Sequence, residues 1–186
     1  MALTGKVQIK YYSDSIFQVG KLLFQFSAYL SLQELKILDF EGTFEVSAKA
    51  NDVFDFLMDA DKLAQCIPGL QKVDKVSNEE FTVLVRVGVA FIKDNFTIKF
   101  KVVESDPGKH AKFSGNGMGK SGTMDLIATM DLTEIAGKTN MVWSAKVSVG
   151  GKIGSLGQRV MAGQAEKIIK QMFESIKANL TGDKGK

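Results

Sequence analysis

The chain has 186 residues, of which 45% are hydrophobic and 24% are charged. That length suits one domain with a substantial core and is too short for us to expect two. The net charge of +3 is small and dispersed, which argues against nucleic-acid binding. A single cysteine, Cys66, and a single histidine, His110, exclude an internal disulfide and metal sites built from Cys or His clusters. We therefore expect no metal and no cofactor.

Residues 1–36 precede the regular pattern and allow two interpretations. The first is an amphipathic segment that docks on a membrane, because large apolar side chains gather on either side of Lys21. The second is a start codon assigned too far upstream, because the residues that follow form a domain that closes without this extension. We find no uninterrupted run of about 18 apolar residues and no secretory signal. The expectation is a cytoplasmic protein, with a peripheral position on the inner face of the cytoplasmic membrane as the alternative.

Regular structure begins with residues 37–48, whose alternating apolar and polar side chains predict a half-buried strand. The spacing becomes helical over residues 50–70 and predicts two short helices, ended by a Pro-Gly pair. The candidate capping residues are Asn51 or Asp52 for the first helix and Asp59 or Asp61 for the second.

A series of alternating segments follows and predicts an antiparallel sheet with one wet face. Within the first of them, side chains from Phe81 to Phe91 at every second position are expected on the apolar face. The third is expected to be a weaker strand because it contains several glycines. The segments are 81–91, 95–103, 110–119, 122–135 and 139–150.

The last element, Ser155–Leu180, is predicted to be a long helix with one apolar face and one charged stripe. The only apolar surface left for that helix is the inner face of the sheet. We therefore predict an α+β helix-grip fold, in which a curved antiparallel sheet wraps around a long C-terminal helix and two short helices follow the first strand. The domain is expected over residues 37–181, with a basic tail over 182–186. The charged stripe is interpreted as a solvated face, with attraction to anionic lipid as the alternative.

Two stretches resemble the carbon monoxide dehydrogenase G-subunit family, which lies within the START-like (SRPBCC) helix-grip superfamily. They are "FEGTFEVSAKANDVFDFLMDADKLAQCIPGLQKV" and "VWSAKVSVGGKIGSLGQRVM", with "CIPGL" (Cys66–Leu70) and the glycine run Gly150–Gly157 as the motifs. The resemblance implies an apolar cavity between sheet and helix that holds a greasy molecule. It also implies an accessory role to a molybdenum-containing CO dehydrogenase or related hydroxylase, docked at the cytoplasmic membrane, with a quinone or a lipid as the ligand.

The inward positions of the predicted strands and helix supply the expected lining of this cavity. Several of these side chains are methionines, which adapt their shape to apolar ligands. The predicted cavity residues are Val85, Val87, Phe96, Ile98, Phe100, Met124, Leu126, Met130, Trp143, Met161, Ile168 and Met172. Four glycines ahead of the last helix do not match the spacing of a nucleotide-binding loop, so we interpret them as a gate at the cavity mouth. The gate residues are Gly150, Gly151, Gly154 and Gly157.

No catalytic residue is predicted, because the inward strand positions carry no carboxylate, histidine or lysine that could act as a general acid or base. Cys66 is expected to be a buried structural thiol, since no histidine or basic cluster lies near it in the sequence. His110 is expected on the solvated surface beside a turn. The leading hypothesis is a binding protein without enzymatic activity. The alternatives are an enzyme similar to the polyketide cyclases and hydrolases of the superfamily, or a stand-alone lipid-binding protein.

Overall fold

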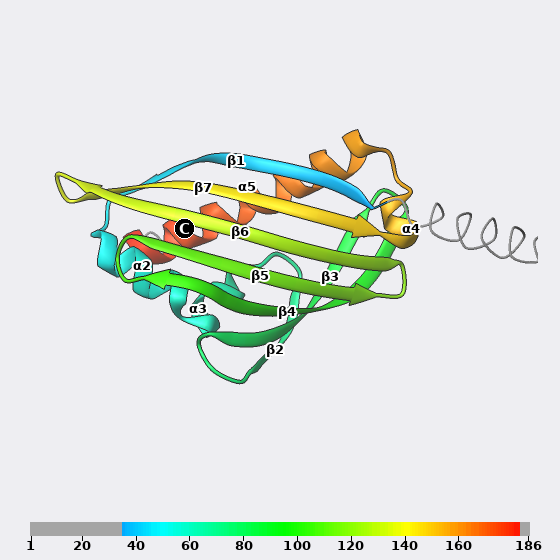
Figure 1. Ribbon diagram of the computed structural model, residues 1–186, viewed down its shortest axis with the longest axis horizontal. Helices are drawn as coiled ribbons and strands as arrows, with labels where there is room; N and C mark the ends of the chain where they lie inside the picture. The colour runs from blue at the N-terminus through cyan, green and yellow to red at the C-terminus, as the bar shows by residue number, and fades with distance from the viewer. Residues whose placement is uncertain (1–34, 183–186) are drawn as a thin grey trace, which may run out of the picture. The chain divides into compact units, whose positions relative to one another are not determined.

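A seven-stranded antiparallel sheet forms the main layer of the protein in a computed structural model, which describes residues 35–182 (Figure 1). The order across the sheet is β1-β7-β6-β5-β4-β3-β2. The strands are β1 (Lys36–Val46), β2 (Leu70–Lys75), β3 (Glu80–Val89), β4 (Ile92–Asp106), β5 (His110–Gly119), β6 (Gly122–Ile135) and β7 (Lys138–Gly150). The helices are α2 (Ala50–Met58), α3 (Ala60–Gln65), α4 (Gly151–Gly154) and α5 (Gln158–Thr181).

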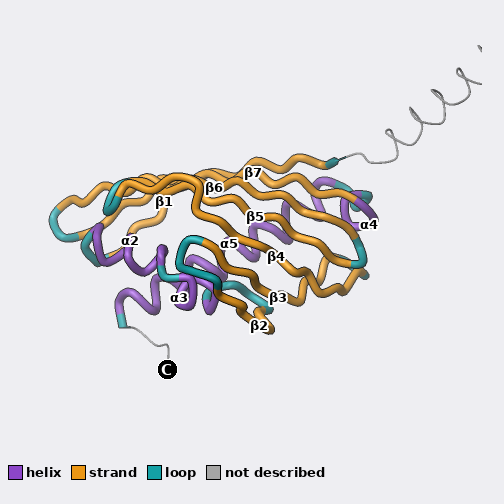
Figure 2. Tube along the Cα trace, turned by 60° about the horizontal axis from the view of Figure 1, so that its bottom comes forward, coloured by secondary structure: helices purple, strands orange, loops and turns teal. Residues whose placement is uncertain are grey.

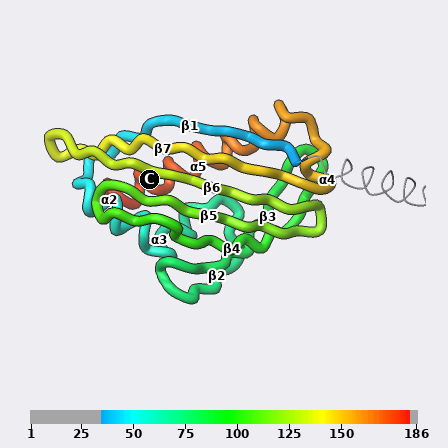
Figure 3. Tube along the Cα trace, in the orientation of Figure 1, coloured from blue at the N-terminus to red at the C-terminus, as the bar shows by residue number. Residues whose placement is uncertain are grey.

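Helices α2, α3 and α5 lie on one side of the curved sheet, as the rotated view shows (Figure 2). α5 runs the length of that side, from α4 at one end to α2 and α3 at the other (Figure 3). Its close contacts with the sheet fall mainly on β1 and β3, which lie toward opposite edges. The predicted helix-grip fold is therefore confirmed. No helix among residues 35–182 has the length and apolar run needed to cross a bilayer.

The predicted alternation sorts side chains between two faces of the sheet. In β6, for example, Met130 and Leu132 are buried beneath the helices, whereas Asp131 is exposed on the other side. We call the side that faces α5 the inner face and the opposite side the outer face. The charged stripe of α5 is exposed, as predicted. Its members are Arg159, Glu166, Lys167, Lys170, Glu174 and Lys177.

Several local predictions are corrected. Phe91 does not lie on the inner face: β3 ends at Val89, and Phe91 stands in the turn before β4 with 86% of its surface exposed. A strand that the polar pattern did not reveal, β2, forms the edge of the sheet. The segment 110–119 forms a full strand despite its glycines. The long helix begins at Gln158, because a separate short helix, α4, precedes it.

The helix caps follow the prediction at only one helix. Asp59 caps α3, since its Oδ1 accepts hydrogen bonds from the backbone N–H groups of Asp61 and Lys62 at 3.1 and 3.3 Å. At α2 neither Asn51 nor Asp52 caps the helix, because the residue at the cap position is Lys49. The backbone N–H of Ala50 instead donates to Oε2 of Glu134 on β6, at 2.8 Å.

Buried apolar side chains form two separate clusters along α5. The first cluster lies toward the α4 end and combines inner-face residues of β3 and β4 with Ile153 and Met161. The second lies toward the α2 end and combines α2 with Met130, Met141 and Ile176. The N-terminal extension is predicted over residues 1–36; residues 1–34 of it, and residues 183–186 of the predicted basic tail, lie outside the described residues, whereas Lys36 already begins β1.

Candidate functional site

The middle of the inner face, between the two buried clusters, is built from two alanines flanked by two aromatic rings. Ala128 of β6 pairs with Ala145 of β7, and we refer to these two residues as the alanine pair. Phe113 of β5 pairs with Ala128, and Phe40 of β1 pairs with Ala145. All four residues are half-buried. Solvent therefore reaches apolar side chains here, although they lie on the face that α5 crosses.

The side of α5 that faces the sheet also carries half-buried apolar residues in its middle part. Its fully buried residues are Met161, one turn from its start, and Ile176, near its end. Ala165, Ile168 and Met172 fall between them on the same helical face and are half-buried. The helix is thus packed tightly at its two ends, and solvent reaches apolar side chains of both the helix and the sheet in between.

The twelve residues predicted from the sequence as cavity lining all lie on the inner face or on the facing side of α5, but they do not form one set. Five of them are packed inside the two buried clusters and are core residues. These five are Val85, Phe96, Ile98, Met130 and Met161. The other seven are half-buried: Val87, Phe100, Met124, Leu126, Trp143, Ile168 and Met172.

The sequence prediction omitted the alanine pair and its two phenylalanines. The alternating pattern of residues 122–135 and 139–150 predicts that Ala128 and Ala145 lie on the inner face, but it does not predict that they are neighbours. What the pattern could not supply is the register that sets these two small residues side by side and places Phe40 and Phe113 next to them. We include these four residues in the candidate site.

Trp143 contributes an indole ring beside the alanine pair. Its ring packs on Phe173 of α5, with centroids 5.1 Å apart, and Phe173 in turn stacks on Phe44 at 5.0 Å. Its other side lies over Gly42, the register partner of Trp143 on β1. The indole Nε1 is buried and has no hydrogen-bond partner among the described residues. A phenylalanine at position 143 would leave no polar group unpaired, whereas the tryptophan buries an N–H donor that has no partner.

The predicted gate begins with a segment that is firmly anchored. Gly151 has a φ of +77°, and a Cβ built on it would stand 2.7 Å from Cα of Gly122. The N–H of Ile153 donates to the carbonyl of Ser121 at 2.9 Å, and the Ile153 side chain is buried. Gly150 and Gly154 are also buried. Gly151 therefore allows close packing of α4 on the β5–β6 turn.

Asp94 on β4 completes this anchor. Its Oδ2 accepts hydrogen bonds from the N–H and the hydroxyl of Ser121, at 2.6 and 2.7 Å. These two hydrogen bonds are the main reason that the pKa of Asp94 lies below its usual value. Of the four predicted gate residues, Gly157 alone is exposed with no atom within 4 Å of a Cβ built on it. Any hinge in this loop is expected at Gly157, which directly precedes α5.

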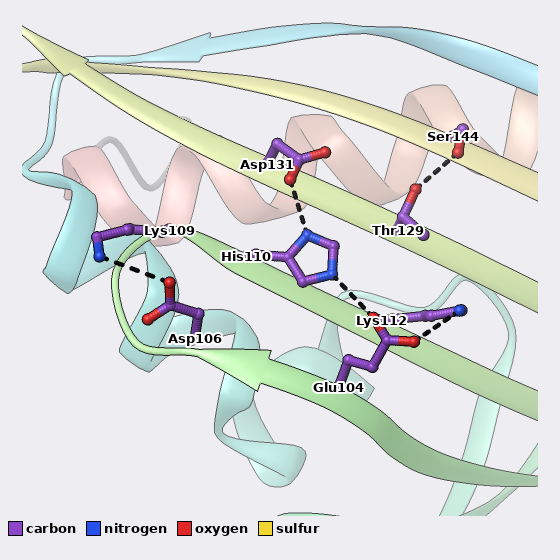
Figure 4. A network of polar contacts seen from close by, with 8 residues as sticks. All are labelled: Glu104, Asp106, Lys109, His110, Lys112, Thr129, Asp131 and Ser144. Atoms are coloured by element: carbon purple, nitrogen blue, oxygen red, sulfur yellow. Dashed lines mark hydrogen bonds and ion pairs between the residues drawn. The ribbon is translucent and has the colours of Figure 1, made fainter.

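His110 lies on the outer face in a network of charged groups rather than standing free in solvent (Figure 4). Its Nδ1 is 2.7 Å from Oδ1 of Asp131, and its Nε2 is 3.6 Å from Oε2 of Glu104. Lys112 pairs with the other oxygen of Glu104 at 2.7 Å. The hydrogen bond to Asp131, with a smaller contribution from Glu104, raises the pKa of His110. The described residues contain no group of three or more His, Cys, Asp or Glu side chains arranged to bind a metal ion.

Cys66 is buried, as predicted. Its S–H lies 3.5 Å from the carbonyl oxygen of Lys62, and burial raises the pKa of the thiol. A raised pKa disfavours the reactive thiolate, which agrees with a structural role.

Comparison with protein families decides the relationship of the chain. Residues 42–181 match the family model of the carbon monoxide dehydrogenase G-subunit, CoxG. The chain belongs to this family. The matched region includes the alanine pair, Trp143, α4 and α5. No curated protein sequence matches the chain.

Several solved structures share the fold of this chain. A conserved protein from Geobacillus kaustophilus is 27% identical, with a TM-score of 0.73 over 78% of this chain and 96% of that one. A START superfamily protein from Mycobacterium smegmatis is 10% identical, with a TM-score of 0.60 over 77% and 97%. The Zhui aromatase/cyclase from Streptomyces sp. R1128 is 16% identical, with a TM-score of 0.58 over 78% and 94%. The last two likenesses establish the fold alone.

Proposed function

We propose that this protein is a non-enzymatic binder of a hydrophobic molecule, a quinone or a lipid, and an accessory to a CO dehydrogenase-type molybdenum hydroxylase at the cytoplasmic membrane. The observation that carries the proposal is the difference in burial between the ends and the middle of the interface between α5 and the sheet. Apolar side chains are fully buried at both ends of α5 but half-buried around the alanine pair and Met172. Apolar surface left in contact with solvent inside a domain is the kind of surface that a greasy ligand covers favourably. We refer to the ligand site proposed here, over the half-buried surface around the alanine pair, as the chamber.

The residues around the chamber favour binding over chemistry. The described inner-face residues near the alanine pair are aliphatic, aromatic or Met, and none of them is ionisable. A general acid or base would have to lie within hydrogen-bond reach of the ligand. The titratable cluster of His110, Asp131 and Glu104 lies on the outer face, across the sheet from the chamber.

The second candidate function is an enzyme similar to polyketide cyclases, which the likeness to the Streptomyces aromatase/cyclase favours. Its weakness is that the described inner-face residues of the strands near the alanine pair include no ionisable group. A cyclase would convert a bound polyketide into a cyclised product, whereas a carrier would release its ligand unchanged. Incubation with a bound ligand, followed by mass spectrometry of the recovered molecule, separates these two functions.

The single tryptophan of the chain makes ligand binding directly measurable. Trp143 lies beside the alanine pair, so a quinone in the chamber should quench its fluorescence. We expect saturable quenching when a short-chain ubiquinone or menaquinone analogue is titrated into the full chain. Ala128→Phe should fill the space in front of the alanine pair and weaken binding at least tenfold.

Ile127→Phe is the matched control. Ile127 is the neighbour of Ala128 in β6, but its side chain lies on the outer face, 42% exposed. This variant should bind the quinone as the unmodified protein does, and both variants should remain folded by circular dichroism. Linear, non-saturating quenching, or equal affinity in Ala128→Phe, would contradict the chamber. Copurification with a molybdenum hydroxylase from the native host tests the accessory role separately.

A further inference from the structure

Phe91 is the most exposed large apolar side chain at the end of the sheet that carries α4. It occupies a two-residue turn between β3 and β4, with Val89 and Ile92 as the last paired residues, and 86% of its surface is in contact with solvent. A single exposed apolar residue needs no explanation in itself. The surroundings of Phe91 make this one informative.

The strand directions bring several separate segments to the same end. β1 begins there and β7 ends there, since Lys36 pairs with Val149, and the β5–β6 turn lies there as well. Val89, Ile153 and Met161 belong to one buried cluster, which joins the β3–β4 turn to α4 and the start of α5. We call this region the α4 end; it lies to the right in Figure 1.

The charged side chains at the α4 end are almost all basic. Lys93, Lys120, Lys152 and Arg159 are exposed there. Three of them, Lys93, Lys152 and Arg159, form no ion pair with any residue in the described range 35–182. Of the acids near this end, Asp94 accepts both hydrogen bonds of Ser121, Asp125 accepts a hydrogen bond from Asn116, and Asp39 pairs with Lys146. The positive charge at this end is therefore largely uncompensated.

The opposite end of the sheet has the reverse character. Its turns and helix α2 carry a predominance of acids, and four of the lysines there are held in ion pairs with them. The acids are Glu45, Asp52, Asp55, Glu79, Glu80, Glu104, Asp106, Asp131 and Glu134. Val76 and Ile135 are exposed at this end too, 78% and 67%, but the lysines beside them, Lys75 and Lys138, are held in ion pairs. The molecule is thus electrically polarised along the strands.

We propose that the α4 end is the surface that contacts an anionic phospholipid bilayer, with Phe91 inserted among the acyl chains and Lys93, Lys152 and Arg159 at the level of the headgroups. An exposed aromatic side chain at an end that also carries lysine and arginine is the composition that anchors proteins at anionic interfaces. The acidic end then faces away from the membrane, which fixes the orientation of the domain. Leu35 and Ile37, 52% and 54% exposed, also lie at the α4 end.

This inference rests on the membrane role within the proposed function and names the surface that carries it. It also distinguishes between two basic surfaces, because the rest of the charged stripe of α5, from Glu166 to Lys177, is a competing candidate. In that stripe Lys170 pairs with Glu174, and Glu166 adds a further negative charge. At the α4 end Lys93, Lys152 and Arg159 form no ion pair among the described residues, so we assign the contact to it.

Cosedimentation of the full chain with vesicles tests the assignment. We expect binding to vesicles of phosphatidylcholine with phosphatidylglycerol and little binding to phosphatidylcholine alone. Phe91→Asp should lower the partition coefficient at least tenfold, since the burial of a phenyl ring is lost. Lys93→Gln and Lys152→Gln should each lower it roughly fivefold, the value of one basic charge near an anionic surface.

Two variants serve as matched controls. Val76→Asp places the same new charge on an equally exposed site at the acidic end, and Lys167→Gln removes a charge from the stripe of α5; both should bind as the unmodified chain does. Unchanged binding in Phe91→Asp, or equal binding to both vesicle types, overturns the assignment. Self-association that Phe91→Asp abolishes, without vesicle binding, also overturns it and identifies a second copy of the chain as the occupant.

The quinone titration of Trp143 keeps the two proposals apart. Phe91→Asp should bind a soluble short-chain quinone with unchanged affinity, because Phe91 lies in a solvent-exposed turn outside the chamber. Loss of vesicle binding with intact quinone binding supports the surface assignment. Intact vesicle binding in Phe91→Asp, with quinone binding retained, refutes the surface and leaves the ligand proposal standing.

Discussion

Trp143 lies directly over Gly42 on the neighbouring strand, and the two residues are register partners. A Cβ built on Gly42 would stand 3.0 Å from Cζ2 and 3.2 Å from Nε1 of the indole. We expect Gly42→Ala to push the indole away from β1 and to destabilise the fold by about 1–3 kcal/mol, the usual cost of overpacking. Urea denaturation gives the change in stability, and the emission maximum of this single tryptophan reports the displacement.

Gly88→Ala is the control for that substitution. Gly88 lies within β3 and has no atom within 4 Å of a built Cβ, so an added methyl meets nothing. This variant should be neutral or slightly more stable, because alanine restricts the unfolded chain. If Gly42→Ala behaves in the same way and leaves the emission unchanged, the close packing of Trp143 on Gly42 is wrong.

Gly157 and Gly151 should respond oppositely to the same substitution. Gly157 is the N-cap of α5, with φ −58° and ψ 140° and open space around it, and its position supplies no side-chain cap to that helix. Gly157→Ser should supply the missing acceptor and stabilise the protein by about 0.5 kcal/mol. Gly151→Ser should destabilise it by about 1–3 kcal/mol, since φ is +77° and the Gly122 backbone leaves no room. Thermal unfolding of both variants measures these shifts, and a destabilised Gly157→Ser would contradict the cap.

His110 should make the stability of the protein depend on pH near neutrality. Its pKa is raised by Asp131 and Glu104 in the folded state, so protonation favours folding. The stabilisation is complete below the unfolded pKa of about 6.5 and is lost as the pH rises through the higher folded pKa. We expect His110→Gln to lower the melting temperature at pH 6 and to have little effect at pH 9.

The single histidine also allows its pKa to be followed by NMR. Replacing the main partner in Asp131→Asn should bring the pKa of His110 down toward its ordinary value. An unshifted titration in this variant would show that Asp131 is not the group responsible.

Glu134 should stabilise α2 from a distant strand. Its carboxylate accepts the hydrogen bond of the Ala50 N–H, at a helix start where Lys49 provides no side-chain cap. Glu134→Ala should cost about 0.5–1 kcal/mol, similar to the loss of a helix cap. Glu45→Ala, which removes only an exposed ion pair with Lys138, should stay within about 0.5 kcal/mol. Equal losses in chemical denaturation of the two variants would contradict the capping role.

The sequence by itself determined the fold class and the face on which each strand residue lies. When one face of a sheet is buried, the apolar residues of an alternating strand must lie on that face. Residues such as Met130 and Asp131 could therefore be assigned to opposite faces without coordinates. The apolar spacing of the last helix likewise identified Met161, Ile168 and Met172 as its buried or half-buried side. These are local properties, set by bond geometry and by the burial of apolar surface.

The tertiary structure alone decided which residues meet. The strand register brings Ala128 beside Ala145 and Trp143 over Gly42, and it depends on turns and on packing far from those positions. The ends of strands were equally hidden: Phe91 continues the apolar alternation of β3, yet the turn places it in solvent. Glu134 caps a helix 84 positions away along the chain. Contacts between distant segments depend on the closure of the whole chain, and no local pattern encodes that closure.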